Sequence, residues 1–115
     1  MKKRREILLY RHYFNEFYNA LSVDVEKKVD YVMKVILTED MIPAKYFKHI
    51  VEVKGLYEIR IESESNIYRI FCCLDEGQVV VLFNGFQKKT QKIPHRQIKK
   101  AQKIMNEYFK EKKGK

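Results

Sequence analysis

The chain of 115 residues and 14.0 kDa is long enough for one domain with a buried core, and we expect a single domain over residues 1–115. Its 45% hydrophobic and 13% aromatic residues are typical of a globular protein, while four glycines and two prolines exclude collagen-like and low-complexity chains. The longest apolar run, residues 79–83, is far shorter than the ~18 residues of a membrane span, so we expect no membrane association.

The formal net charge of +9 is confined to the last quarter of the chain. Residues 1–86 hold 13 basic and 13 acidic side chains, whereas residues 87–115 hold 11 basic and only two acidic ones. Such an asymmetry favours a polyanionic partner, most often a nucleic acid. We interpret residues 110–115 as a solvated helix end, and Lys88, Lys89 and Lys92 as candidates for binding.

The N-terminus and the cysteines indicate a reducing, cytoplasmic location. Residues 1–5 resemble the basic start of a signal peptide, but the apolar run at residues 7–10 is too short to follow it. Cys72 and Cys73 are neighbours on a predicted strand and would point to opposite faces, so we expect free, packed thiols. Their spacing from the three histidines fits no metal site, and we expect neither metal nor cofactor.

The first part of the chain predicts a short strand followed by two helices. Residues 6–10 form the strand. Apolar side chains at residues 14, 17, 18 and 21 share one helical face, and the same spacing recurs over residues 25–37, with the end near Thr38. The connection of about two residues predicts an antiparallel hairpin, which we interpret as scaffold.

From Gly55 the hydrophobic period changes to two, which predicts strands. The segments 56–62, 67–74 and 79–83 are separated by the turns 63–66 and 75–78, and they predict an antiparallel meander. One face would pack on the helices, and the other would carry Glu58, Arg60 and Arg69.

The last part of the chain predicts a basic loop and a helix. Residues 84–93 form the loop, and Pro94 is favoured in the first turn of the helix that follows. The predicted fold class is α+β, with an antiparallel sheet and the order β-α-α-β-β-β-α.

Basic side chains from three neighbouring strands would converge on one spot suited to a phosphate. Arg60 and Arg69 lie on adjacent strands, with Lys88 and Lys89 after the third; arginine offers a planar fork of donors and lysine a point charge. Phe86 would either stack on a base or pack at the rim. The alternative for Arg60 is a surface ion pair with Glu58 or another glutamate on the hairpin, worth under ~1 kcal/mol.

Three segments resemble the HigB-like branch of the RelE/ParE toxin superfamily. They are residues 55–60, residues 67–71 and residues 82–94, of which the Phe-x-Lys-Lys-Thr-x-Lys-x-Pro pattern in the third is the most specific. The resemblance implies a RelE-like fold and a type II toxin that cuts mRNA in the ribosomal A site. It also implies a cognate antitoxin, usually a helix-turn-helix protein of the HigA type.

The resemblance also implies roles for individual residues. Arg69 matches the family's most dependable active-site arginine, Arg60 a basic position on the preceding strand, and Lys88 and Lys89 the basic position after the last strand. Relatives use a Tyr or His near the C-terminus for proton transfer, and His95 is the nearest substitute here.

Glu58 is a second candidate for the general base, while Lys92 and Arg96 extend the predicted RNA-binding surface that includes Phe86. Where the family pattern has a threonine before the helix-opening proline, this chain has Ile93, which cannot cap the helix with its side chain.

The expected reaction is a metal-independent transesterification by an endoribonuclease. The mRNA 2′-OH would attack the adjacent phosphorus, and clustered cations would stabilise the added negative charge. The alternatives are a ParE-like poison of DNA gyrase and a non-catalytic RNA-binding module.

Overall fold

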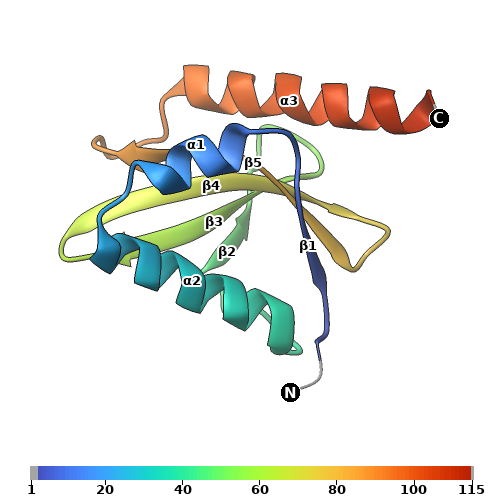
Figure 1. The fold of residues 1–115 in the computed structure, drawn as a ribbon. Helices are drawn as coiled ribbons and strands as arrows, with labels where there is room; N and C mark the ends of the chain where they lie inside the picture. Colours follow the sequence, from blue (N-terminus) through green and yellow to red (C-terminus); the bar gives the residue numbers. More distant parts are fainter. Residues whose placement is uncertain (1–2, 115) are drawn as a thin grey trace.

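The computed structural model describes residues 3–114 and contains five strands and three helices (Figure 1). Their bounds in chain order are β1 (Glu6–Leu9), α1 (Tyr13–Asn19), α2 (Val23–Thr38), β2 (Phe47–His49), β3 (Leu56–Ser63), β4 (Asn66–Asp75), β5 (Val79–Lys88) and α3 (His95–Lys113).

All five strands form one sheet in the order β1-β5-β4-β3-β2. Strands β3, β4 and β5 pair antiparallel in succession, which confirms the predicted meander. The edge strands come from elsewhere in the chain: β1 pairs parallel with β5, and β2 pairs antiparallel with β3. The sheet is therefore mixed, and mostly antiparallel.

Two predictions about the strands are wrong. The order is β-α-α-β-β-β-β-α, because the three-residue strand β2 is too short for an alternating pattern to indicate it. The predicted basic loop at residues 84–93 begins too early, since β5 continues to Lys88 and stays paired with β4. Asn84 and Gly85, a dipeptide typical of turns, lie within this strand.

A β-bulge in β5 explains how the strand accommodates these residues. Ile70 of β4 pairs with Gly85 and Cys72 pairs with Leu82, so β5 has one more residue than β4 in this interval. A bulge of this kind reverses which residues of a strand point to each face. Side chains beyond the bulge therefore lie on the opposite face from the one that alternation from Leu82 would give them.

Helices α1 and α2 cover one face of the sheet, as predicted, and run in roughly opposite directions (Figure 1). The core on this face contains alternate residues of the meander, among them Ile59, Ile61 and Ile70, packed against Val29 and Val32 of α2. Ser22 caps α2, because its hydroxyl accepts a hydrogen bond from the Val25 N–H.

Helix α3 lies over the opposite face, where it forms a second core (Figure 1). Ile98, Ala101, Ile104 and Met105 pack on residues of the sheet such as Phe71. The sequence pattern assigned the last helix to neither face, and the structure shows that α3 buries part of the face that carries Glu58, Arg60 and Arg69.

The two cysteines lie in different cores, as expected from alternation along β4. Cys72 belongs to the core under α1 and α2, Cys73 belongs to the core under α3, and both are free. Burial raises the pKa of both thiols, that of Cys73 to about 12, so neither is poised to react.

The basic N-terminal segment anchors α2. The Arg5 guanidinium donates hydrogen bonds to the carbonyl oxygens of Ile36, Glu39 and Asp40, at 3.0, 2.7 and 2.7 Å. These carbonyls lie at or just beyond the last turn of α2, where a cation is favoured by the helix dipole.

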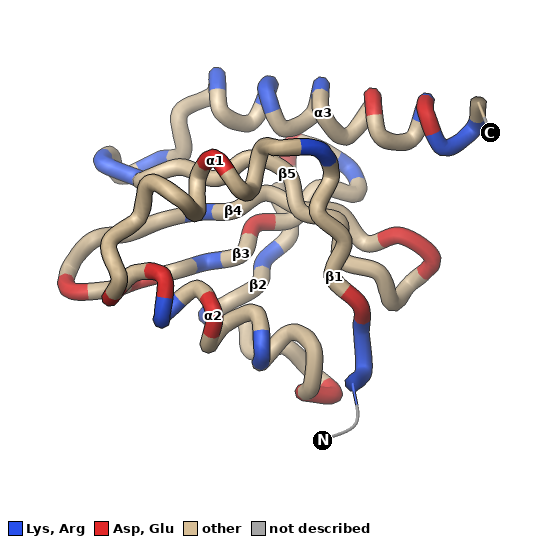
Figure 2. Tube along the Cα trace, in the orientation of Figure 1, with Lys and Arg blue, Asp and Glu red and all other residues tan. Residues whose placement is uncertain are grey.

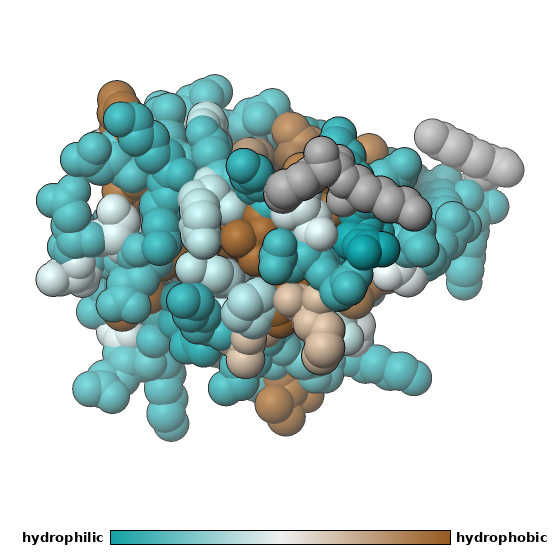
Figure 3. Space-filling model, turned by 90° about the horizontal axis from the view of Figure 1, so that it is seen from below, coloured by the Kyte–Doolittle hydropathy of each residue, from teal (hydrophilic) through white to brown (hydrophobic). Residues whose placement is uncertain are grey.

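The surface on the α2 side is mostly hydrophilic, and the hydrophobic residues seen in this view are scattered over it (Figure 3). Within residues 3–114, no helix has both the length and the apolar composition needed to cross a membrane.

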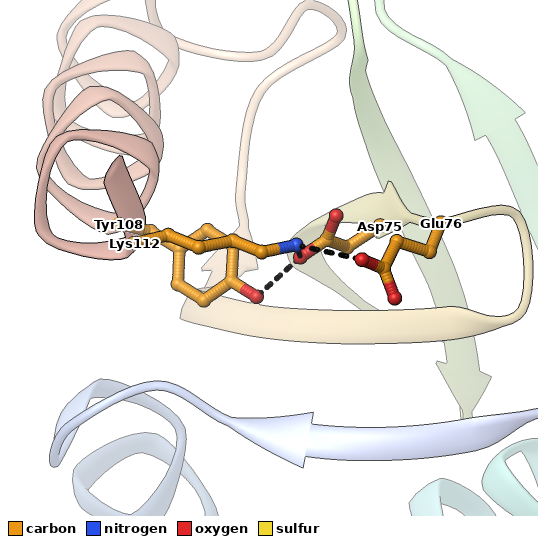
Figure 4. Close-up of polar contacts among 4 residues, drawn as sticks. All are labelled: Asp75, Glu76, Tyr108 and Lys112. Atoms are coloured by element: carbon orange, nitrogen blue, oxygen red, sulfur yellow. Dashed lines mark hydrogen bonds and ion pairs between the residues drawn. The ribbon is translucent and has the colours of Figure 1, made fainter. Parts of the chain in front are cut away.

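The C-terminal half of α3 is fixed to the β4–β5 turn by a cluster centred on Asp75 (Figure 4). Both the Tyr108 hydroxyl and the Lys112 ammonium donate hydrogen bonds to Asp75 Oδ2, at 2.6 and 2.7 Å. Chiefly through the Lys112 contact, and then through Tyr108, the pKa of Asp75 is lowered. Glu76 lies farther away, 3.5 Å from the Lys112 ammonium.

We expect Gly85→Ala to destabilise the protein. A Cβ atom at this position would lie 2.6–2.9 Å from three ring atoms of Phe17, so the α1 helix or the bulge has to move. Such overpacking costs about 1–3 kcal/mol, which urea unfolding would measure. Gly114→Ala, whose nearest contact is at 3.6 Å, is the control and should change the free energy of unfolding by less than about 0.5 kcal/mol.

We also expect Asp75→Asn to remove a pH-dependent part of the stability. A carboxylate with a lowered folded-state pKa stabilises the protein above its unfolded pKa and ceases to do so as the pH falls through the folded pKa. The variant should be less stable than the wild type at about pH 7, and the difference should shrink progressively as the pH falls below 3.8, the ordinary pKa of an aspartate. Urea unfolding across this range is the measurement, and Glu76→Gln is the control; a gap that is constant with pH would contradict the assignment.

Candidate phosphate-binding site

Two cross-strand rows on the same face of the sheet bring the predicted site residues together. Arg60, Arg69 and Phe86 pair across β3, β4 and β5 in one row. In the next row on that face, two residues along each strand, Glu62 pairs with Ile67 and Ile67 with Lys88. Because of the bulge in β5, Phe86 and Lys88 share a face with the two arginines.

Glu58 lies between the two guanidinium groups. Its Oε1 is 2.9 Å from Arg69 Nε and 3.3 Å from Arg60 Nε. Arg69 is 5% exposed and Glu58 6%, whereas the Arg60 side chain is 35% exposed. The predicted ion pair of Arg60 with a hairpin glutamate is thus present, and Arg69 shares the same carboxylate.

Burial and charge act in opposite directions on Arg69. Burial lowers the pKa of Arg69 and the neighbouring Arg60 lowers it further, while the Glu58 carboxylate raises it. Arg69 also donates a hydrogen bond to the Tyr68 carbonyl oxygen at 3.0 Å. Arg69 is therefore fixed in place, and Arg60 is the more accessible of the two guanidinium groups.

A cavity of about 420 Å³ opens beside the two arginines. Its charged lining residues are Lys28, Lys45, Arg60, Arg69 and Lys88, with Glu62 as the one acidic group among the lining residues of the described chain. Lys28 and Lys45, which come from α2 and from the turn before β2, were not predicted from the sequence. The cavity is within the range of ligand pockets, roughly 300–1,000 Å³, and its lining suits an anion.

The two lysines that follow the predicted last strand separate in the structure. Lys88 lines the cavity, and its ammonium donates a hydrogen bond to the Gln91 carbonyl oxygen at 2.7 Å. Lys89 is exposed and lines a neighbouring hollow together with Ser65 and Asn66 of the β3–β4 turn.

Phe86 is the cross-strand neighbour of Arg69, and one side of its ring packs against other residues of the protein. Its ring stacks on Phe71, with centroids 5.6 Å apart and planes at 25°, and it contacts the core under α3. The ring is half-buried. The alternative interpretation of Phe86, rim packing, therefore describes its contacts within the protein.

The remaining predicted residues lie away from the arginine pair. His95 and Arg96 are exposed in the first turn of α3, and neither lines the cavity that holds Arg60 and Arg69. Lys92 lines a second cavity of about 290 Å³ that also includes Lys48 and Glu58. Glu58 thus lines this second cavity and contacts both arginines of the first, and each cavity has basic side chains.

Lysine and arginine residues are concentrated in the segment before α3 and in the first half of α3 (Figure 2). The basic positions there are Lys88, Lys89, Lys92, Arg96, Lys99, Lys100 and Lys103. This surface adjoins the sheet face that carries the arginine pair, so a long polyanion meets positive charge beyond the cavity as well.

Chemically, the arrangement can bind a phosphate and stabilise additional negative charge on it. Guanidinium groups held in a partly buried site interact with an anion more strongly than surface charges do. Among the described residues, no group of three or more His, Cys, Asp or Glu side chains is placed to hold a metal ion.

Comparison with known proteins assigns the chain to one protein family. The chain matches the family described as phage derived protein Gp49-like (DUF891) over residues 16–106, which include α2, the whole meander and most of α3. A comparison with curated proteins gave no match. The chain therefore belongs to the Gp49-like family of phage-derived proteins, a RelE-type, toxin-like family.

Proposed function

We propose that this protein is the toxin of a type II toxin–antitoxin system, of the HigB-like type, which cuts mRNA on the translating ribosome in the cytoplasm. The observation that carries the proposal is the cluster of Arg60, Arg69 and Lys88 around one cavity of a chain in a toxin-like family. A phosphodiester is the anion that such a toxin has to bind.

The two arginines have different roles in this proposal. Arg60 and Arg69 bind the scissile phosphate, and Arg69 is held in position by Glu58 before the substrate arrives. When the 2′-OH attacks the phosphorus, negative charge accumulates on the non-bridging oxygens, and the fixed guanidinium groups stabilise it without reorganising. The bond from phosphorus to the 5′-oxygen then breaks, leaving a 2′,3′-cyclic phosphate and a 5′-OH.

The reaction also moves two protons, one from the 2′-OH and one to the leaving 5′-oxygen. Glu58 is unsuited to accept the first, because its carboxylate already pairs with both arginines and is buried. We assign Glu58 a positioning role and assign proton transfer to Lys88, which lines the cavity. His95 and Lys89 lie farther out and would act only through a rearrangement on the ribosome.

Two partners follow from the proposal. The ribosome supplies the mRNA and a surface of RNA phosphates, which suits the basic segment before α3 and the first half of α3 (Figure 2). A cognate antitoxin, of the helix-turn-helix HigA type, would hold the toxin inactive, and we expect an acidic surface on it with salt-sensitive association.

We expect Arg69→Lys to reduce mRNA cleavage strongly in a purified translation system. Lysine keeps a positive charge beside Glu58 but lacks the planar fork that contacts two phosphate oxygens. Loss of one such donor typically lowers the rate by ~10²–10³. Primer extension on a translated mRNA measures the cuts, and Lys110→Gln, which removes a charge from the exposed last turn of α3, is the control.

The melting temperature separates catalysis from structure in this experiment. If Arg69→Lys is inactive but has the melting temperature of the wild type, the result supports the catalytic role of Arg69. Full cleavage by a folded Arg69→Lys variant would contradict that role. If the wild type cuts no translated mRNA but its expression produces DNA breaks and an SOS-type response, the gyrase alternative replaces the proposed function.

A further inference from the structure

The cavity beside the arginine pair has a second group of cations that the reaction at one phosphate does not use. The Lys28 ammonium lies 5.5 Å from the centre of the Tyr31 ring and 5.7 Å from that of Tyr46. The Lys45 ammonium lies 5.0 Å from the same Tyr46 ring. Two cations therefore share one aromatic ring, and both belong to the lining of the cavity.

These two lysines come together through the tertiary structure. Lys28 is on α2, which covers the other face of the sheet, and Lys45 is in the turn that leads into β2. The turn is fixed to the sheet, because the Arg60 N–H donates a hydrogen bond to the Tyr46 carbonyl oxygen at 2.8 Å. Lys45 is thereby held beside Arg60, where β3 extends beyond its pairing with β2.

Within residues 3–114, no carboxylate forms an ion pair with Lys28 or with Lys45. Glu58 is already occupied by the two arginines, and Glu62 is the one acidic residue that lines the cavity, against five basic ones. Like charges that line one cavity repel one another, and an anion bound between them would offset this repulsion. The tyrosine ring offsets only part of this repulsion, since a cation–π contact is a weak interaction at an exposed site.

We propose that Lys28 and Lys45, seated on Tyr46, form a second phosphate subsite that holds the phosphate next to the scissile one on the same RNA strand. This inference rests on the proposed function, and it specifies the path of the RNA strand across the protein surface. The strand would pass from Lys88 and the arginine pair around the edge of β3 to α2. The two lysines would then fix the position of the backbone on one side of the cut, as positioning residues that do not touch the reacting atoms.

The test is the salt dependence of binding to a single-stranded RNA that cannot be cut because its 2′-hydroxyls are methylated. Removing one phosphate contact lowers the slope of log K against log salt concentration by about 0.7 for a single strand. We expect Lys28→Gln and Lys45→Gln each to reduce the slope by about this amount, and the double variant to reduce it by about twice as much. Fluorescence anisotropy of the labelled RNA measures both affinity and slope.

Two control variants make the result specific. Lys27→Gln removes the same charge from the adjacent, exposed position of α2 and should leave the slope as in the wild type. Arg60→Gln reports on the proposed scissile-phosphate site and should weaken binding. All variants are first compared by melting temperature, so that a loss of binding is not a loss of fold.

The outcomes separate the subsite from the proposed function. If Lys28→Gln and Lys45→Gln behave as Lys27→Gln does while Arg60→Gln weakens binding, the second subsite is wrong and the first site stands. If Arg60→Gln also leaves binding unchanged, the cavity does not hold RNA, and both the subsite and the proposed function lose their support. A slope that falls by the expected amount in the two lysine variants but not in Lys27→Gln, together with weaker binding by Arg60→Gln, supports the subsite.

Discussion

The candidate site depends on one extra residue in β5. Without the bulge between Leu82 and Gly85, alternation would turn Phe86 and Lys88 toward α1 and α2. With it, both lie on the face of the two arginines, and Gly85 occupies the place beneath the Phe17 ring where no side chain fits. The strand therefore contributes hydrophobic residues to both cores before the bulge and a cation to the cavity after it.

Glu58 makes the arrangement of the arginines possible. Arg60 and Arg69 are direct cross-strand partners, a pairing of like charges that is unfavourable by itself. The buried carboxylate of Glu58, two residues before Arg60 on the same face of β3, contacts both and offsets part of their repulsion. The buried Glu58–Arg69 ion pair holds the Arg69 guanidinium in a fixed position. The Arg60 guanidinium is more exposed and remains available to a ligand.

The pattern of the sequence contained most of the fold but only part of the site. Period-two alternation identified β3 and β4 and the first half of β5, and it placed Arg60 and Arg69 side by side. It did not reveal β2, which is three residues long, or the end of β5, where Asn84 and Gly85 resemble a turn. Register across strands, the bulge and the edge of β3 decide which cations meet, and none of these is visible in local spacing. For this reason the sequence does not indicate Lys28 and Lys45 as site residues, since only the packed fold brings α2 and the turn before β2 to the cavity.

The parallel pairing of β1 with β5 has a consequence for how the chain matures during synthesis. Glu6 pairs with Val79 and Leu9 with Leu82, so the first strand has no partner until residues 79–82 have left the ribosome. A pairing of such high sequence separation forms late, because the intervening loop must be closed first. The sheet that carries the arginine pair is thus completed only after β5 has left the ribosome. Under the proposed function, a nascent chain therefore has no complete phosphate site before Lys88 emerges, and an antitoxin that covers this site can bind only afterwards.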